Sequence, residues 1–215
     1  IMGEIHDGNT TGQPVLRHRK PTLPVVVAAV PATSDDFDSR SLGPQWQWHA
    51  NHQDGWHSLS ARAGWLRLFG QHSPALALER VPNLLLQKLP AREFAVATRL
   101  DFVGLPPGAE AGLVIMGRRH AALAVRQTES GPQLVLRQDG DRPLGTLTTG
   151  CAVLRLQLEQ GGSCTFGGSA EGARPVIVDT PFAAQAGVWI GAKVGLYALG
   201  GGHADFDYFR FFRLD

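Results

Sequence analysis

The sequence lacks several features that membrane-spanning and nucleic-acid-binding proteins need. Its longest apolar runs, such as VVVAAV at 25–30, fall far short of the roughly 20 residues that cross a bilayer. Its 20 Lys and Arg side chains are balanced by 19 Asp and Glu, so no overall field attracts a polyanion or an anionic membrane surface. We therefore expect neither a membrane nor a nucleic acid as a partner.

Cysteine is scarce, and its two copies, Cys151 and Cys164, flank a stretch that is typical of a hairpin turning at Gly161 and Gly162. In that register Cys164 lies near Glu159, with Cys151 on the order of 25 Å away at about 3.3 Å per strand residue. A disulfide needs Cα atoms within about 7 Å, so we predict two free thiols. Cysteine use does not reveal the compartment; an extracellular or periplasmic location is favoured over a cytoplasmic one.

Helix signals are also missing, because no segment of roughly ten residues combines a capped start with an apolar stripe of period 3.6. Short alternating stretches bounded by Gly, Pro, Asp and Asn recur instead, each with one face to bury. Many half-buried strands without crossover helices predict an all-β fold of two packed antiparallel sheets, a β-sandwich or jelly roll. The clearest stretches are WLRLF at 65, FAVATRLDF at 94, GLVIMG at 112, AALAVR at 121, QLVLRQ at 133, AVLRLQL at 152, KVGLYA at 193 and FDYFRFF at 206.

The first 34 residues carry four prolines and no long amphipathic pattern, which is typical of a tail or linker. The chain opens at Ile1 without a basic start or an apolar signal core, so we interpret it as a piece of a longer protein. We expect residues 1–34 to be a tail or linker and residues 35–215 to form one β-sandwich module.

Catalytic signatures are absent too. Ser169 in GGSAEG has neither the closing glycine nor the strand-to-helix context of a nucleophile elbow. Glycoside hydrolysis needs two carboxylates about 5 to 9.5 Å apart, one of them with a raised pKa. Spacing singles out no such pair, and most candidates adjoin turn residues, where carboxylates are normally solvated. We predict no catalytic centre in this chain. The acidic candidates are Asp54, Glu79, Asp101, Glu110 and Glu171.

The stretch WQWHANHQDGW at 46–56 is unusually rich in tryptophan and histidine. If it begins as a strand, Trp46 and Trp48 share one face, and Trp46 is a core residue, as is Trp65 in its own alternating stretch. Trp56 follows the turn signal NHQDG and has two interpretations. It is either an exposed platform for a pyranose ring, with short polar partners around it, or an aromatic plug at the sheet end.

Polar residues elsewhere could line a groove with Trp56, although an ordinary exposed loop is the favoured explanation for them. Gln87 closes the apolar stretch NLLLQ, and Arg118 and His120 lie in GRRHA between two strands. The candidate ligand-binding residues are Trp48, His49, Asn51, Asp54, Trp56, Gln87, Arg118 and His120.

Aspartates mark both ends of the predicted sandwich, in DDFD at 35–38 and ADFDYF at 204–209. Terminal strands of a jelly roll often lie side by side, and clusters of oxygen ligands suit Ca²⁺. The sequence thus suggests a structural calcium site; the alternative is that these carboxylates cap turns and pair with Arg210 or Arg40. The calcium candidates are Asp36, Asp38, Asp205 and Asp207.

Several blocks in one order, from about Ser34 to Phe212, resemble the C-terminal concanavalin A-like β-sandwich of family 43 glycoside hydrolases of the β-xylosidase and arabinofuranosidase type. The segment GQPVLRHRKP resembles the passage from the family's five-bladed propeller catalytic domain into the sandwich. The matching blocks are DDFDSRSLGPQWQWHANHQDGWHSLSARAGWLRL, NLLLQKLPAREFAVATRLDF, AGLVIMGRRHAALAV and GVWIGAKVGLYALGGGHADFDYFRF.

The resemblance implies a non-catalytic carbohydrate-binding module that binds xylan or xylo-oligosaccharides in hemicellulose degradation. It also implies a propeller catalytic domain in the same polypeptide, preceding the 1–34 linker. One alternative is a structural accessory domain that packs on the propeller and completes its active site without binding sugar itself. Another is that the sandwich is itself a hydrolase, as in some glucanases, against which the absence of a spaced acidic pair counts.

Overall fold

The computed structural model describes residues 17, 19, 21, 22 and 32–214. Contacts divide the chain into Ile1–Val30 and Pro31–Asp215. Most of the predicted tail over 1–34 lies outside the described residues, so the domain boundary stays a prediction. In the described part of the chain, no helix is long and apolar enough to cross a membrane.

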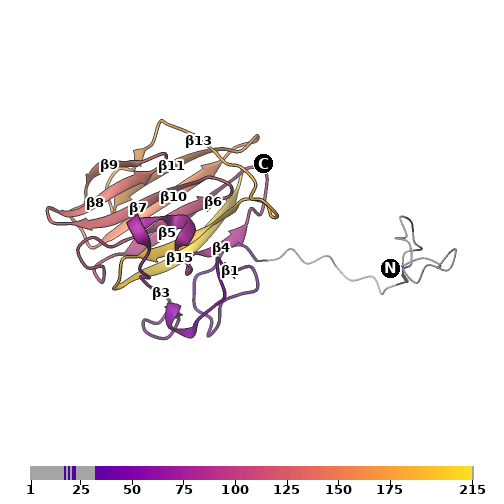
Figure 1. Cartoon of the computed structure of the whole chain (residues 1–215), viewed down its shortest axis with the longest axis horizontal. Helices are drawn as coiled ribbons and strands as arrows, with labels where there is room; N and C mark the ends of the chain where they lie inside the picture. The colour runs from indigo at the N-terminus through magenta and orange to yellow at the C-terminus, as the bar shows by residue number, and fades with distance from the viewer. Residues whose placement is uncertain (1–16, 18, 20, 23–31, 215) are drawn as a thin grey trace. The chain divides into compact units, whose positions relative to one another are not determined.

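Residues 35–213 form two antiparallel sheets packed face to face, which confirms the predicted β-sandwich (Figure 1). One sheet has seven strands in the order β1-β4-β14-β6-β7-β8-β9. The other has eight, in the order β12-β11-β10-β5-β15-β3-β2, with β13 also paired to β11. Hairpins of consecutive strands, such as those joining β6, β7, β8 and β9, alternate with connections that cross between the sheets. The two terminal regions meet where Asp35 pairs with Phe209.

The seven-stranded sheet contains β1 (Gln47–Trp48), β4 (Leu85–Lys88), β6 (Glu110–Met116), β7 (His120–Thr128), β8 (Gly131–Arg137), β9 (Asp141–Thr146) and β14 (Lys193–Leu199). The eight-stranded sheet contains β2 (His57–Ser58), β3 (Leu66–Phe69), β5 (Phe94–Asp101), β10 (Cys151–Leu158), β11 (Ser163–Ala170), β12 (Val176–Ile177), β13 (Phe182–Ala183) and β15 (His203–Arg213). Three single-turn 3-10 helices are η1 (Asp54–Trp56), η2 (Pro74–Leu76) and η3 (Leu78–Arg80).

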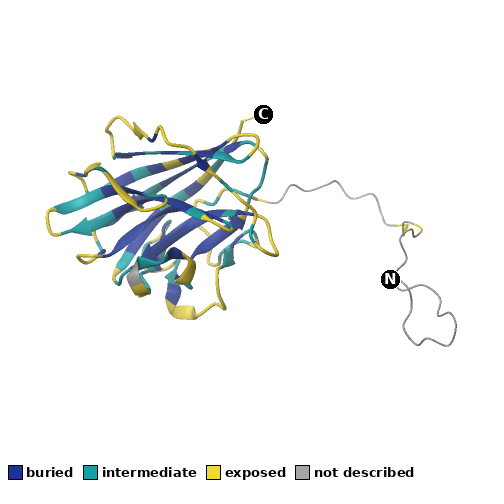
Figure 2. Cartoon of the chain, turned by 45° about the horizontal axis from the view of Figure 1, so that its top comes forward, coloured by how far each residue is buried: buried dark blue, intermediate teal, exposed yellow. Residues whose placement is uncertain are grey.

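The main core lies between the sheets and follows the period-two pattern of the sequence (Figure 2). On β10 the residues Leu154, Leu156 and Leu158 are buried, while Arg155 and Gln157 between them are exposed. Burying each such leucine stabilises the fold by about 1.5 to 3 kcal/mol. The alternation therefore fixes which face of each strand is left for binding.

The predicted β10–β11 hairpin is confirmed, and its turn uses Gly161 and Gly162 at φ of 87° and 88°. Left-handed backbone of this kind costs a glycine little. Cys164 pairs with Leu158, one residue from the expected neighbour. Cys151, at the far end of β10, and Cys164 are both free, as predicted.

A second, smaller core covers the outer face of the seven-stranded sheet. The segment 71–84, which contains η2 and η3, lays Leu78, Val81 and Leu84 over apolar residues of the sheet, including Met116 and Tyr197. Its presence means that this outer face is not simply solvated. Sequence patterns missed the segment because single 3-10 turns carry no extended periodicity.

An ion cluster beneath segment 71–84 ties it to the sheet. Glu110 is fully buried and pairs with Arg126 at 2.6 Å and with Arg137. The Tyr197 hydroxyl donates to the same carboxylate at 2.9 Å, and Arg137 also donates to the Leu76 carbonyl at 2.7 Å. A buried charge needs such complete pairing. Glu110 is therefore an exception to the expectation that most of the acidic candidates are solvated turn carboxylates.

Candidate functional site

The first tryptophan of WQWHANHQDGW belongs to the core, as predicted. Trp46 is buried, and its ring meets Phe209 edge to face with centroids 5.1 Å apart. Its indole N–H donates a 2.8 Å hydrogen bond to Asp35. Trp65 is also buried, with the guanidinium of Arg62 3.6 Å above its ring.

Trp56 lies inside an aromatic cluster that we define as Trp48, His52, Trp56 and His57. It is only 4% exposed, and its ring centroid is 5.5 Å from that of Trp48 and 6.1 Å from that of His52. His52 stacks on the half-buried Trp48 at 5.1 Å and 15°. A stacking platform for sugar needs an open ring face, so the burial of Trp56 agrees with the plug interpretation.

The polar residues predicted to surround Trp56 are exposed, whereas its ring is buried. His49, Asn51 and Asp54 are all exposed on the turn. Burial, reinforced by the charge of His52, lowers the pKa of His57 against the opposing effect of Asp54. The aromatic cluster therefore holds a neutral imidazole at neutral pH.

Gln87 is separated from the other candidates by its burial. It is 2% exposed, and its amide donates a 2.9 Å hydrogen bond to the carbonyl of Thr33. This contact attaches the segment just before Asp35 to β4. The buried amide is therefore used in a backbone contact.

Three predicted residues do come together at two adjoining pockets on the outer face of the seven-stranded sheet, which we call the outer hollow. The pockets share Met116 and Gly117 and have volumes of about 460 and 250 Å³. Arg118 and His120 line the larger pocket, and His49 lines the smaller. The other lining residues are Glu79, Arg119, Asp139 and Gly140 in the larger pocket, and Leu86, Gly187, Val188, Trp189, Ile190, Gly191 and Lys193 in the smaller.

The polar groups of the outer hollow are positioned by segment 71–84 and by the β6–β7 turn. His120 Nδ1 lies 3.9 Å from the Glu79 carboxylate, and His49 Nε2 donates to the Glu79 carbonyl at 3.2 Å. Burial lowers the pKa of His120 despite the opposing charge of Glu79. Arg119 pairs with Asp139 at the rim. A neutral imidazole, a guanidinium and a carboxylate can each form hydrogen bonds with hydroxyl groups.

Trp189 is an exposed aromatic residue of the outer hollow that the sequence patterns did not single out. It is 94% exposed, and its neighbours Val188 and Ile190 are 72% and 52% exposed. These three residues stand between Gly187 and Gly191 in a loop without regular structure. The signal was present as an apolar triplet between glycines in GVWIGAK, where no alternation assigns a buried face.

Three of the four predicted calcium ligands take part in ion pairs with arginines. Asp205 accepts hydrogen bonds from Arg67 Nε at 2.7 Å and Nη2 at 2.8 Å. Asp207 pairs with Arg99 at 3.0 Å, while Asp38 is exposed on its turn. Across 32–214 and the few described residues before them, no three His, Cys, Asp or Glu side chains are placed to hold a metal. Calcium remains an untested prediction.

The remaining terminal carboxylate follows the alternative given for these aspartates. Asp36 pairs with Arg210 at 3.2 Å, one of the two arginine partners considered. Both side chains are more than half exposed. Exposed pairs of this kind contribute about 0 to 1 kcal/mol, so this contact adds little to stability.

Two carboxylates, Asp101 and Asp205, lie directly opposite each other on β5 and β15. Arg62 Nη1 donates to both, at 2.7 Å and 3.3 Å. Burial alone would raise the pKa of Asp205, but the hydrogen bonds and charges of Arg67 and Arg62 outweigh it and hold that pKa below its ordinary value. A glycosidase acid needs a raised pKa. The pair is therefore arranged as a salt-bridge network and not as a general acid with its partner.

The fold and the arrangement of its surface define a concanavalin A-like β-sandwich module. Residues 34–212 match the family described as "Beta xylosidase C-terminal Concanavalin A-like domain". The chain belongs to this family.

Several of the known proteins that this chain resembles are considerably longer than it is. A β-xylosidase of Formosa agariphila is 27% identical over 98% of this chain but only 40% of its own length. A family 43 glycoside hydrolase structure from Bacillus licheniformis is 25% identical with a TM-score of 0.74, covering 94% of this chain and 43% of that one. A bifunctional GH43-CE protein of Bacteroides eggerthii, 24% identical with a TM-score of 0.76, covers 85% and 26% and shares the fold. The chain thus spans less than half of these relatives.

Proposed function

We propose that this chain is a non-catalytic accessory module of a family 43 glycoside hydrolase. It packs on the propeller catalytic domain of the same polypeptide and presents the loop 187–191 to that domain's substrate site. The observation that supports this proposal most strongly is the exposure of Trp189, which is 94% exposed between two exposed aliphatic residues. An apolar patch of this kind on a soluble domain is typical of an interaction surface.

The length of the relatives supports a partner domain as the occupant of this surface. The family relatives extend well beyond the module, since it covers 40% of the Formosa β-xylosidase. Tryptophan is among the residues that contribute most to interfaces, with losses of 2 kcal/mol or more on truncation. The neighbouring polar groups His49 and Lys193 line the same pocket and can meet sugar hydroxyls or polar groups of the propeller.

The test replaces Trp189 by Ala in the complete polypeptide that carries this chain. We expect kcat/KM on xylobiose to fall by about tenfold or more, because a hot-spot contact is lost. Val103→Ala is the control, since Val103 is likewise an exposed apolar residue, at 72%, but does not line the outer hollow. Unchanged kinetics of Trp189→Ala, or an equal loss in Val103→Ala, would contradict the docking proposal.

Xylan binding by the module itself is a second candidate, favoured by the polar character of the larger pocket. Its roughly 460 Å³ is lined by His120, Glu79 and Arg118, and Trp189 stands at the adjoining pocket. Sites of this openness have affinities in the micromolar to millimolar range, about 4 to 8 kcal/mol.

Calorimetric titration of the isolated chain with xylohexaose, with cellohexaose as the control, tests this candidate. We expect heat with xylohexaose alone and its loss in His120→Ala. If neither sugar gives heat, the outer hollow has no independent xylan site and docking remains its proposed role.

A further inference from the structure

The outer face of the eight-stranded sheet carries a row of side chains that crosses four strands. Thr165 on β11 lies opposite Gln157 on β10, which lies opposite Ala95 on β5, which lies opposite Phe212 on β15. Strands are about 4.8 Å apart, so the row is about 14 Å long. Gln157 is exposed and Phe212 is 50% exposed. The row thus combines an apolar ring, a small gap, an amide and a hydroxyl.

A second row runs beside the first, two residues further along each strand. It pairs Arg210 with Ala97, Ala97 with Arg155, Arg155 with Gly167, and Gly167 with Ile177. Ala97 and Gly167 lie on either side of Arg155 on the neighbouring strands. Because neither has a long side chain, the surface is lower there than at Arg155. A Cβ on Gly167 would already lie 3.4 Å from the Val176 carbonyl, so a larger side chain there would fill the space.

Arg155 differs from the other arginines of this face by its lack of a carboxylate partner. It is exposed, and no ion pair or hydrogen bond links its guanidinium to another described residue. On the same face the paired arginines are Arg62 with Asp101 and Asp205, Arg67 with Asp205, Arg99 with Asp207 and Glu171, and Arg210 with Asp36.

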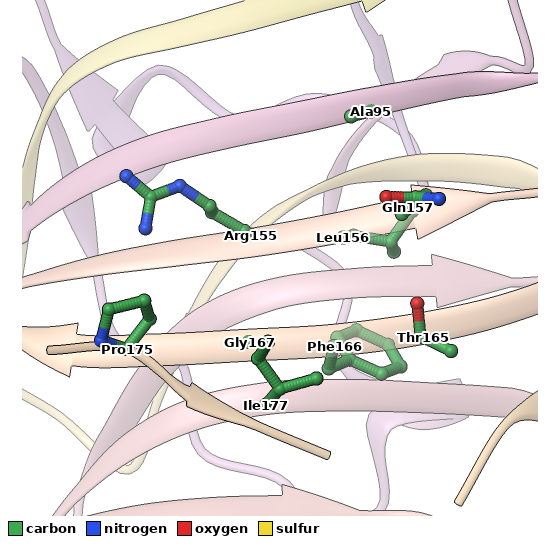
Figure 3. Close-up of a pocket in the computed structure, with 9 residues that line it drawn as sticks. All are labelled: Ala95, Arg155, Leu156, Gln157, Thr165, Phe166, Gly167, Pro175 and Ile177. Carbon is green, nitrogen blue, oxygen red and sulfur yellow. The ribbon is translucent and has the colours of Figure 1, made fainter. Parts of the chain in front are cut away.

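A pocket of about 200 Å³ lies between Arg155 and the apolar edge formed by Pro175 and Ile177 (Figure 3). Arg155 and Gln157 project from β10, and Thr165 and Gly167 lie on the next strand (Figure 3). Drug-sized ligands occupy about 300 to 1,000 Å³, so this pocket suits a single sugar-sized group. It is lined by an unpaired guanidinium, two neutral polar groups and an apolar wall.

We propose that this pocket binds a uronic acid unit carried as a side group on a xylan-type chain. The guanidinium of Arg155 pairs with the carboxylate, for which its planar fork is suited. Gln157 and Thr165 bind ring hydroxyls, and Ile177 and Pro175 cover the apolar C–H face of the sugar. The backbone of the saccharide extends over Ala95 toward the ring of Phe212. This site lies on the other sheet from the outer hollow and does not depend on docking at Trp189.

The test is a calorimetric titration of the 215-residue chain with xylotetraose bearing one glucuronic acid group. The same oligosaccharide with its carboxyl group reduced to an alcohol, and unsubstituted xylotetraose, are the comparison ligands. We expect the acidic ligand to bind at least about tenfold more tightly than the reduced one, because a charge-assisted pair is lost on reduction. Equal affinity for the acidic and reduced ligands would overturn the proposal, as would absence of binding by the acidic ligand.

Variants separate the carboxylate contact from general charge. Arg155→Gln should lose the preference for the acidic ligand, whereas Arg142→Gln, an exposed arginine on β9 of the other sheet, should retain it. Phe212→Ala should weaken the binding of the acidic and reduced ligands by the same factor, since the apolar ring does not distinguish a carboxylate from an alcohol. Each variant is at an exposed position, and its thermal unfolding is checked against the parent. If Arg142→Gln weakens binding as much as Arg155→Gln does, the attraction is nonspecific and the site is rejected.

Discussion

Trp48 and Trp56 pack edge to face with ring centroids 5.5 Å apart, and this contact joins β1, at the edge of one sheet, to η1, which precedes the edge strand β2 of the other. His52 covers Trp48 from the other side at 5.1 Å. The tryptophans that make this stretch conspicuous in the sequence are therefore used mainly for packing. The ring that faces solvent is Trp189, more than 130 positions further along the chain.

Trp56→Ala should lower the free energy of unfolding by about 3 to 5 kcal/mol, because it removes a buried ring and leaves a cavity. Trp189→Ala should change it by no more than about 0.5 kcal/mol, since that ring is 94% exposed. Urea unfolding of the isolated chain measures both values. Equal stability of the two variants would mean that Trp56 does not act as a plug.

The two thiols should react very differently. Burial raises the pKa of Cys164 to about 12, while Cys151 is half-buried and its pKa is raised less strongly, again mainly by burial. A colorimetric thiol reagent at about pH 8 should therefore modify at most Cys151 in the folded chain and both cysteines in guanidinium. Fewer than two reactive thiols in denaturant would contradict the assignment of free cysteines.

Calcium removal tests the aspartates at the chain ends. Binding of Ca²⁺ to the folded state alone would raise Tm, whereas the ion pairs of Asp36, Asp205 and Asp207 require no metal. Since these carboxylates already have arginine partners, we expect a chelator to leave Tm unchanged. A rise of several degrees on adding back CaCl₂, but not MgCl₂, would support the calcium site instead.

The fold could be predicted from the sequence because apolar residues alternate with smaller or polar ones within each long strand. Phe94, Val96 and Leu100 alternate with smaller or polar residues, and all three are buried as predicted. The site was harder to predict because it depends on contacts between distant segments. Segment 71–84 covers a sheet face that alternation leaves open, and Glu110 becomes a buried ion through arginines on two other strands.

Local turn signals likewise could not decide between exposure and burial. NHQDG places Trp56 after a turn, but the partners that bury it, Trp48 and His52, act through their side-chain packing. Arg118, His120 and His49 line adjoining pockets, but without Trp56; Arg118 lies in the β6–β7 turn and His120 begins β7. Gln87 points to the Thr33 carbonyl, a contact with a segment for which the sequence predicted no partner in the sheet.

The pair between Asp205 and Arg67 makes stability depend on pH in a defined direction. The folded pKa of Asp205 lies below its ordinary value, because the arginine contacts outweigh burial. A lowered carboxyl pKa stabilises the fold at pH values above the unfolded pKa, about 3.9, and this contribution is lost as the pH falls through the folded pKa. Asp205→Asn should therefore cost about 3 kcal/mol near pH 7, where it leaves Arg67 without its charged partner.

The difference between the parent chain and Asp205→Asn should shrink steadily below about pH 4 as the carboxylate of the parent becomes protonated. Urea unfolding at a series of pH values gives both curves. Asp36→Asn is the control, because its pair with Arg210 is exposed on both sides and should contribute no more than about 1 kcal/mol at any pH. Parallel curves for the parent and Asp205→Asn would show that Asp205 keeps an ordinary pKa in the folded chain, and the salt-bridge account of the β5–β15 carboxylates would then fail.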